Sequence, residues 1–273
     1  MDDASLIKNP ANGWFDGVAD RYAKSRPRYP EAFFEWMAKQ APALNRCWDA
    51  ACGNGQSSIG LTRWFKQVEA TDLSAEQIAK AEPHAQVNYR VEAAEEAQLP
   101  ANSMDAVLVA SAIHWLDVAK FNKQTERILR PQGLLVWIGY DPLQGAPAGI
   151  QHWLDDLYHK RLRERWPPQR IHVDRQFSDL PFPIPAHPLP NQFFIKVDWS
   201  LQNLINFINT WSALRRSEQK TDHFQKKPLI NILKQELEEL WPINQPKIQF
   251  RFPMMGRWGN WPSQIDKTKS INQ

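Results

Sequence analysis

The sequence has little cysteine and no long apolar segment. Its only two cysteines, Cys47 and Cys52, are too few for a disulfide framework or a structural zinc site. No apolar run approaches the roughly 20 residues that a bilayer span needs. The acidic residues that follow Met1 lack the apolar core of a secretory signal. We therefore expect a cytoplasmic protein in a reducing compartment, with no membrane partner.

The sequence also has little excess charge of either sign. The formal net charge is +3, which gives no reason to expect a nucleic-acid partner. Basic residues nevertheless concentrate between Lys160 and Arg175, against only Glu164 and Asp174. This stretch is either a solvated helix face or a positive rim that attracts an anionic substrate. The 13 tryptophans are scattered, so we expect most of them in the core and a few around a pocket.

Internal repeats and low-complexity tracts are absent, and the organisation comes from alternation. Short apolar strands alternate with helical stretches from residue 46 to 140, which is typical of a parallel sheet covered by helices. The predicted strands are 46–50, 68–71, 87–92, 104–110 and 134–140. The predicted helices are 57–65, a short one from residue 74, and 118–129. The fold class is therefore α/β, a Rossmann-like, seven-stranded, mostly parallel sheet with helices on both faces.

The alternation breaks after residue 141. A helix is predicted over 151–165, and the prolines that follow as far as Pro190 exclude regular structure. We interpret 142–190 as a helical, proline-rich cap inserted over the sheet. The C-terminal part, about 193–258, should hold strands at 193–199 and 247–254 and helices at 201–214 and 228–240, before a disordered tail at 267–273. All of it is predicted to be one domain, with its cofactor-binding core at about 46–140.

A turn with two glycines follows the first strand. Gly53 and Gly55 let backbone N–H groups approach a ligand closely. Asp72 ends the second strand, 19 residues after Gly53, and that spacing suits a carboxylate that accepts both ribose hydroxyls. Ala94 and Glu95 follow the third strand, where an adenine edge is expected. These three parts predict a nucleoside-binding site.

Two nucleotide cofactors share such a turn. A dinucleotide-binding fold expects a third glycine three residues after the second, where this sequence has Ser58. It also needs a second mononucleotide-binding half, which we do not find after Tyr140. S-adenosylmethionine has no pyrophosphate and demands less of the helix N-terminus. A dinucleotide-dependent oxidoreductase is therefore kept only as the alternative.

The segment from Asp49 to Gly55 resembles the first motif of class I S-adenosylmethionine-dependent methyltransferases (methyltransferase type 11), with Ala51 in place of the first glycine. Further segments resemble the small-molecule group that includes trans-aconitate methyltransferases. They are Tyr22-x-x-x-Arg26-Pro27-x-Tyr29-Pro30, Ala93-Ala94-Glu95, Ala112-Ile113-His114-Trp115, Thr210-Trp211-Ser212-Ala213 and Phe252-Pro253-Met254-Met255-Gly256-Arg257.

The resemblance implies cofactor-binding roles. Asp49 and the backbone from Ala51 to Gly55 would hold the methionine moiety, Asp72 the ribose and Leu73 one adenine face. The remaining cofactor-binding candidates are Ala94 and Glu95 at the adenine edge, Ser111 near the methionine amine, and Tyr22 and Arg26 on a segment that closes over the cofactor. The product would be S-adenosylhomocysteine, and no metal is expected.

Substrate-binding candidates lie after the fourth strand and in the C-terminal part. His114 and Trp115 follow that strand at the carboxyl edge of the sheet, where open α/β folds bind ligands. A hydroxyl acceptor would need a base, and His114 would have a suitable pKa near neutrality. A carboxylate acceptor would need no base, and an arginine such as Arg215, near Trp211, would orient it.

These patterns predict a methyltransferase that acts on a small molecule, with O-methylation of an anionic or carboxyl-bearing acceptor. Alternatives are the oxidoreductase and a non-catalytic protein that binds S-adenosylmethionine, since fold alone does not secure activity. The segment Ser111-Ala112-Ile113-His114 lacks the pattern of amino-methylating nucleic-acid enzymes. The protein is expected to be a monomer or homodimer.

Overall fold

The structure, a computed structural model, describes residues 27–214 and 229–263. Its strands are β1 (Arg46–Ala50), β2 (Gln67–Asp72), β3 (Val87–Val91), β4 (Met104–Ala110), β5 (Leu129–Tyr140), β6 (His187–Pro188), β7 (Phe194–Trp199) and β8 (Ile248–Asn260). Its α-helices are α2 (Glu31–Gln40), α3 (Gln56–Leu61), α4 (Ala75–Ala79), α5 (Val118–Ile128), α6 (Ala148–Asp156), α7 (Arg170–Asp174), α8 (Leu201–Ile208) and α10 (Leu229–Leu240). Shorter helical turns are η1 (Ala94–Glu96), η2 (Ile113–Trp115), η3 (Leu157–Arg161) and η4 (Arg163–Arg165).

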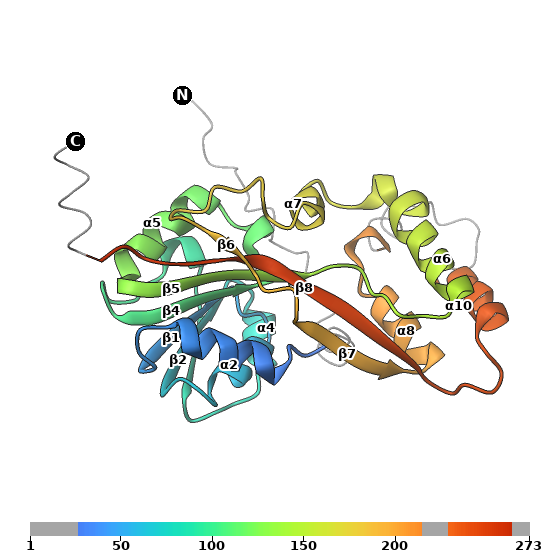
Figure 1. The fold of residues 1–273 in the computed structure, drawn as a ribbon, viewed down its shortest axis with the longest axis horizontal. Helices are drawn as coiled ribbons and strands as arrows, with labels where there is room; N and C mark the ends of the chain where they lie inside the picture. Colours follow the sequence, from blue (N-terminus) through green and yellow to red (C-terminus); the bar gives the residue numbers. More distant parts are fainter. Residues whose placement is uncertain (1–26, 215–228, 264–273) are drawn as a thin grey trace.

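The sheet runs in the order β3-β2-β1-β4-β5-β8-β6, with β7 paired to β8 off this path (Figure 1). Strands β1 to β5 are mutually parallel, and β8 runs antiparallel to β5. This confirms the predicted Rossmann-like α/β fold. The carboxyl ends of β1, β2, β4 and β5 therefore meet at one edge, which is where such sheets bind ligands.

Both faces of the sheet are buried. In β4, Leu108 belongs to the core cluster that contains Phe33 of α2, whereas Val107 belongs to the cluster that contains Phe121 of α5. A strand with both faces covered needs apolar side chains at successive positions, as the sequence of β4 predicted. None of the helices in the two described ranges is long and apolar enough to span a membrane.

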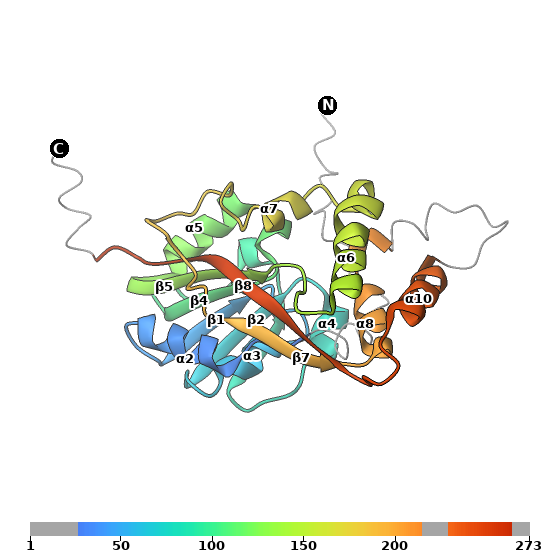
Figure 2. The same cartoon turned by 45° about the vertical axis from the view of Figure 1, so that its right-hand side comes forward.

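Strand β8 is longer than predicted, and its two halves pair with different strands. Residues from Met254 onward pair with β5, whereas those from Ile248 to Pro253 pair with β7. The end that pairs with β7 extends beyond the parallel strands toward α6, α8 and α10 (Figure 2). The predicted end at residue 254 was wrong because the second half of the strand is specified by pairing with β5, a contact distant in sequence.

The cap contains more regular structure than its prolines suggested. Helix α7 fits between Pro168 and Pro181, and β6 includes Pro188 yet pairs with β8. Proline is tolerated there because β6 is the edge strand, so an outward-facing position needs no N–H donor. Helices α6 and η3 contribute Leu154 and Leu157 to the same core cluster as the sheet.

Candidate functional site

The turn after β1 has left-handed backbone at three positions. The φ angles of Ala51, Gly53 and Gly55 are 54°, 56° and 79°. A Cβ on Gly55 would lie 2.3 Å from Oη of Tyr89, so glycine is required there on two grounds. At Ala51 the left-handed conformation costs about 1–2 kcal/mol, which is the physical consequence of the alanine that replaces the family's first glycine.

Asp72 closes this turn from the neighbouring strand. Its carboxylate accepts hydrogen bonds of 2.8 Å each from the backbone N–H groups of Gly53 and Ser74, one on each oxygen. Burial raises the pKa of Asp72 above its ordinary value, against these two hydrogen bonds. Leu73, the next residue, leaves 40% of its surface exposed. A carboxylate with unused lone pairs beside an exposed apolar surface fits a ribose and an adenine face.

Asp49 is fully buried under the turn. Its Oδ2 accepts hydrogen bonds from the hydroxyls of Ser57 and Ser58, at 2.8 and 2.6 Å. Burial raises the pKa of Asp49 to about 6, and its Oδ1 has no hydrogen-bond partner among the described residues. Ser58, at the position of the missing third glycine, therefore anchors α3 to β1. Direct contact of Asp49 with the cofactor stays a prediction.

The segments after β3 and β4 are fixed by specific hydrogen bonds. Glu95, next to the buried Ala94 in η1, accepts at 2.9 Å from the backbone N–H of Asp117, which begins α5. Ser111, also left-handed with φ 55°, lies 2.9 Å (Oγ to Oη) from Tyr29. These bonds hold both segments at the carboxyl edge of the sheet, as a cofactor site requires.

His114 follows β4 in η2. Its ring stacks on Phe177, with centroids 6.2 Å apart, and lies 5.1 Å from the Trp115 ring. Burial lowers its pKa to about 3, helped by the positive charges of Arg170 and His172. Its Nδ1 is buried without a hydrogen-bond partner among the described residues. The expected pKa near neutrality was therefore wrong, because the sequence did not reveal this enclosure.

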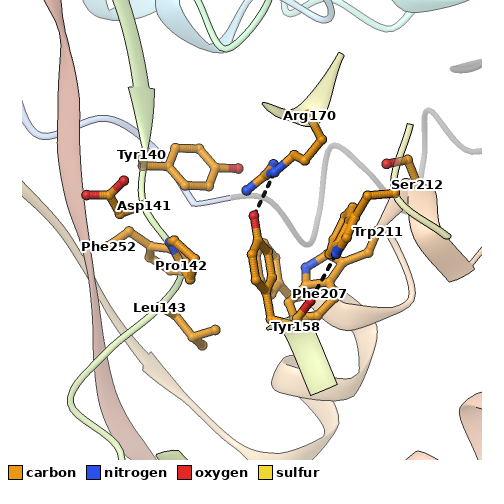
Figure 3. A pocket seen from close by; sticks show the side chains of 11 residues that line it. Tyr140, Asp141, Pro142, Leu143, Tyr158, Arg170, Phe207, Trp211, Ser212 and Phe252 are labelled. Atoms are coloured by element: carbon orange, nitrogen blue, oxygen red, sulfur yellow. Dashed lines mark hydrogen bonds between the residues drawn. The ribbon is translucent and has the colours of Figure 1, made fainter. Parts of the chain in front are cut away.

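A small pocket, of about 50 Å³, opens where β5 ends (Figure 3). Aromatic side chains form most of its lining, and Trp211 is among them. The lining residues are Tyr140, Asp141, Pro142, Leu143, Tyr158, Trp166, Arg170, Phe207, Trp211, Ser212 and Phe252. Trp211 was singled out from its motif, whereas the others needed the fold, because they come from β5, η3, α7, α8 and β8.

Arg170 is the cation of this pocket and was not among the predicted site residues. The one available signal was its place in the basic stretch, for which a solvated helix face and a positive rim around a substrate were the two interpretations. Arg161 and Arg175 form surface ion pairs with Glu236 and Asp179, as on a solvated face. Arg170 instead lines the pocket, and its charge affects both His114 and Asp141.

Three of the predicted residues, Tyr22, Arg26 and Arg215, lie outside the described residues, as does the predicted tail. Within the described ranges, no group of three histidine, cysteine, aspartate or glutamate side chains gathers as metal ligands would.

The sheet and its order define a Rossmann-like α/β protein, and comparison with known proteins identifies the family within this class. Residues 48–137 match the model of a methyltransferase domain family. A solved structure from Anaeromyxobacter dehalogenans, provisionally assigned as a type II methyltransferase, is 32% identical with a TM-score of 0.77, over 87% of this chain and 99% of that one. A provisionally assigned methyltransferase of Dictyostelium discoideum is 26% identical over 73% of this chain and 76% of its own.

An uncharacterized methyltransferase of Mycobacterium tuberculosis is 35% identical over 128 residues, 45% of this chain and 51% of that protein. The chain belongs to the class I S-adenosylmethionine-dependent methyltransferases and is an enzyme of that family. This overturns the alternative of a dinucleotide-dependent oxidoreductase. The narrower resemblance to trans-aconitate methyltransferases stays a prediction.

Proposed function

We propose that the enzyme transfers the methyl group of S-adenosylmethionine to an oxygen of a small molecule that carries a negative charge, with a carboxylate as the acceptor. The observation that supports this most is Arg170, which lines the pocket at the end of β5. A guanidinium there can orient a carboxylate through two parallel hydrogen bonds.

The properties of His114 favour a carboxylate over a hydroxyl. A hydroxyl acceptor must lose its proton during transfer, and an effective general base has a pKa near the working pH. With a pKa of about 3, the ring of His114 is neutral at pH 7 but a weak base. A carboxylate is already ionised and needs no base. His114 then borders the reacting end of the acceptor together with Trp115, and we retain both as site residues.

The cofactor assignments are part of the same proposal. Asp72 would hold the ribose, Leu73 and the segment of Ala94 and Glu95 the adenine, and the turn from Ala51 to Gly55 the methionine end. The bound cofactor supplies an electrophilic methyl on a sulfonium. The protein contributes alignment of the acceptor oxygen with that methyl and exclusion of water. The buried walls of the pocket and the α7 segment are suited to excluding water.

Two measurements test this function. Calorimetry with S-adenosylhomocysteine should show binding, and its absence with folded protein would end the proposal. Release of S-adenosylhomocysteine is then followed against carboxylic acids and against the alcohols obtained by reducing each acid. We expect transfer to the acids, with base-labile methyl esters as products. Turnover restricted to the alcohols or to amines would contradict the carboxylate acceptor.

A further inference from the structure

We propose that the acceptor is an aromatic acid, with its flat ring between the walls of the Arg170 pocket and its carboxylate facing Arg170. This inference rests on the proposed function and adds the chemical class of the substrate. It is carried by two properties of the pocket, the nature of its walls and the way Arg170 is held, and the opposing charge of Asp141 provides a test.

Two aromatic walls enclose the pocket (Figure 3). Tyr140 of β5 and Phe252 of β8 form one wall, in edge-to-face contact at 5.3 Å. Tyr158 and Trp166 form the other, with centroids 4.8 Å apart, and Trp211 extends it at 5.6 Å from Trp166.

Phe207 joins the two walls at the floor, because its ring lies 5.3 Å from Phe252 and 5.9 Å from Trp211. Aromatic pairs prefer offset and edge-to-face geometry. A flat ring bound among these side chains gains such contacts, whereas a saturated ring or chain gains only burial.

Arg170 is held in place by groups that do not use its full donor set. Its guanidinium lies 5.2 Å over the rings of Tyr158 and Trp166, and its Nε donates to Oη of Tyr158 at 2.7 Å. Nε is also 3.5 Å from Asp174, to which Tyr158 donates at 2.8 Å. Among the described residues, no hydrogen bond engages the two terminal nitrogens of Arg170. A stacked guanidinium with both outer nitrogens available is arranged for bidentate pairing with a planar anion.

The position of Tyr158 agrees with a functional role for this wall. It belongs to η3, a π-helical turn that continues directly from α6. Such turns are uncommon and occur frequently at functional sites. The turn places Tyr158 so that its phenol accepts from Arg170 and donates to Asp174, which fixes the plane of the guanidinium.

Asp141 is the group that opposes an anion in this pocket. It lines the pocket, and its Oδ2 accepts from Nε2 of Gln176 at 3.1 Å. Asp174, the second carboxylate near Arg170, is about half-exposed and is therefore screened by water. Removing the charge of Asp141 should therefore strengthen the binding of an aromatic acid.

The test uses the whole enzyme saturated with S-adenosylhomocysteine. Benzoate, 2-naphthoate, cyclohexanecarboxylate and benzyltrimethylammonium are titrated by calorimetry, with the fluorescence of the pocket tryptophans as a second readout. We expect the aromatic acids to bind at least tenfold more tightly than cyclohexanecarboxylate, and the cation not to bind. This comparison needs no substitution, so it does not depend on a variant that folds.

Variants then locate the anion. Arg170→Gln should weaken 2-naphthoate binding at least tenfold, and Arg170→Lys should do so less. Asp141→Asn should tighten it. Arg163→Gln is the matched control, because Arg163 is an exposed arginine of the same cap segment and is not part of the pocket lining. Circular dichroism and thermal melting confirm that each variant folds.

Several outcomes would overturn the inference. Equal affinity for benzoate and cyclohexanecarboxylate would mean that the pocket recognises charge without a ring. Tighter binding of the cation, no binding of any probe, or an effect of Arg163→Gln equal to that of Arg170→Gln would each contradict it. Calorimetry with S-adenosylhomocysteine is scored separately. Cofactor binding with turnover only on non-aromatic acids would therefore retain the proposed function and reject the aromatic acceptor.

Discussion

The backbone N–H of Gly53 donates to Oδ2 of Asp72 across 2.8 Å, between residues 19 apart in the sequence. This bond joins the turn after β1 to the end of β2. The two segments that the sequence predicted separately as parts of a cofactor site are therefore one hydrogen-bonded unit. A substitution at either residue should therefore alter the position of the other.

Asp72→Ala should abolish measurable binding of S-adenosylhomocysteine in calorimetry and also destabilise the fold. The substitution removes the group proposed to hold the ribose and leaves two backbone donors without their acceptor. Hydrogen bonds to a charged group contribute about 1.5–3 kcal/mol each.

Asp105→Ala is the matched control for this loss. Asp105 is a buried carboxylate at the N-terminal end of β4, away from the carboxyl edge of the sheet. It accepts hydrogen bonds from the backbone N–H groups of Asn45 and Arg46 at 2.7 and 2.9 Å. It should lose stability while retaining affinity. Equal loss of affinity in both variants would show that Asp72 acts only through folding.

Ala51→Gly should stabilise the protein by up to about 1 kcal/mol. It relieves a left-handed alanine, which costs about 1–2 kcal/mol, and part of this gain is offset by the greater freedom of glycine in the unfolded chain. Gly55→Ala, the reverse change four residues later, should destabilise by more than about 1 kcal/mol, because its Cβ would strike Tyr89. Urea unfolding measures both. A destabilising Ala51→Gly would contradict the strain assigned to this position.

Ser58→Ala should cost about 1–3 kcal/mol of stability, since it removes one of two hydroxyl donors from the buried Asp49 carboxylate. Ser57→Ala removes the other donor. The double variant should lose more than the sum of the two single losses, because it leaves the buried carboxylate without either hydroxyl. Additive losses in a double-mutant cycle would mean that the two serines act independently of Asp49.

His114→Gln should flatten the pH dependence of stability below pH 6.5. The pKa of His114 is about 3 in the folded protein and about 6.5 in the unfolded chain, so between these values only the unfolded chain binds the proton. Wild-type stability is therefore full above pH 6.5 and falls by up to about 1.4 kcal/mol per pH unit as the pH drops toward 3.

The measurement is urea unfolding of both proteins at pH 7.0 and 5.0. Asp49, whose pKa is raised from 3.8 to about 6 in the folded protein, has the opposite effect on the free energy of unfolding: between these two pH values it increases stability as the pH falls. Because it does so in both proteins, the difference between them isolates His114. Identical slopes would contradict the enclosure of the ring.

Local sequence predicts those elements of this protein whose conformation is determined by residues close in the chain. The first strand has the predicted bounds, Arg46–Ala50, and Ser74 caps α4 by accepting from the N–H of Gln77. The glycine turn and Asp72 could also be recognised, because strand alternation and turn chemistry are short-range signals.

The parts that the sequence did not predict depend on distant pairings. The extension of β8 to Asn260 is specified by β5, more than a hundred residues earlier. Arg170 enters the pocket only because Tyr158 and Trp166 stack beneath it, and the low pKa of His114 requires Phe177 to cover its ring. None of these contacts leaves a local pattern in the chain.

The two halves of β8 pair with different strands, and this difference determines which parts of the protein a substitution can alter. The half of β8 that pairs with β5 belongs to the sheet whose edge carries the glycine turn. The half that pairs with β7 packs in one core cluster with helices α8 and α10 and with Trp211. Substitutions in those helices can reshape one wall of the pocket without altering the register of the parallel strands. A new acceptor could thus be accommodated while the methyl-donor edge stays unchanged, with the peptide between Pro253 and Met254 as the boundary.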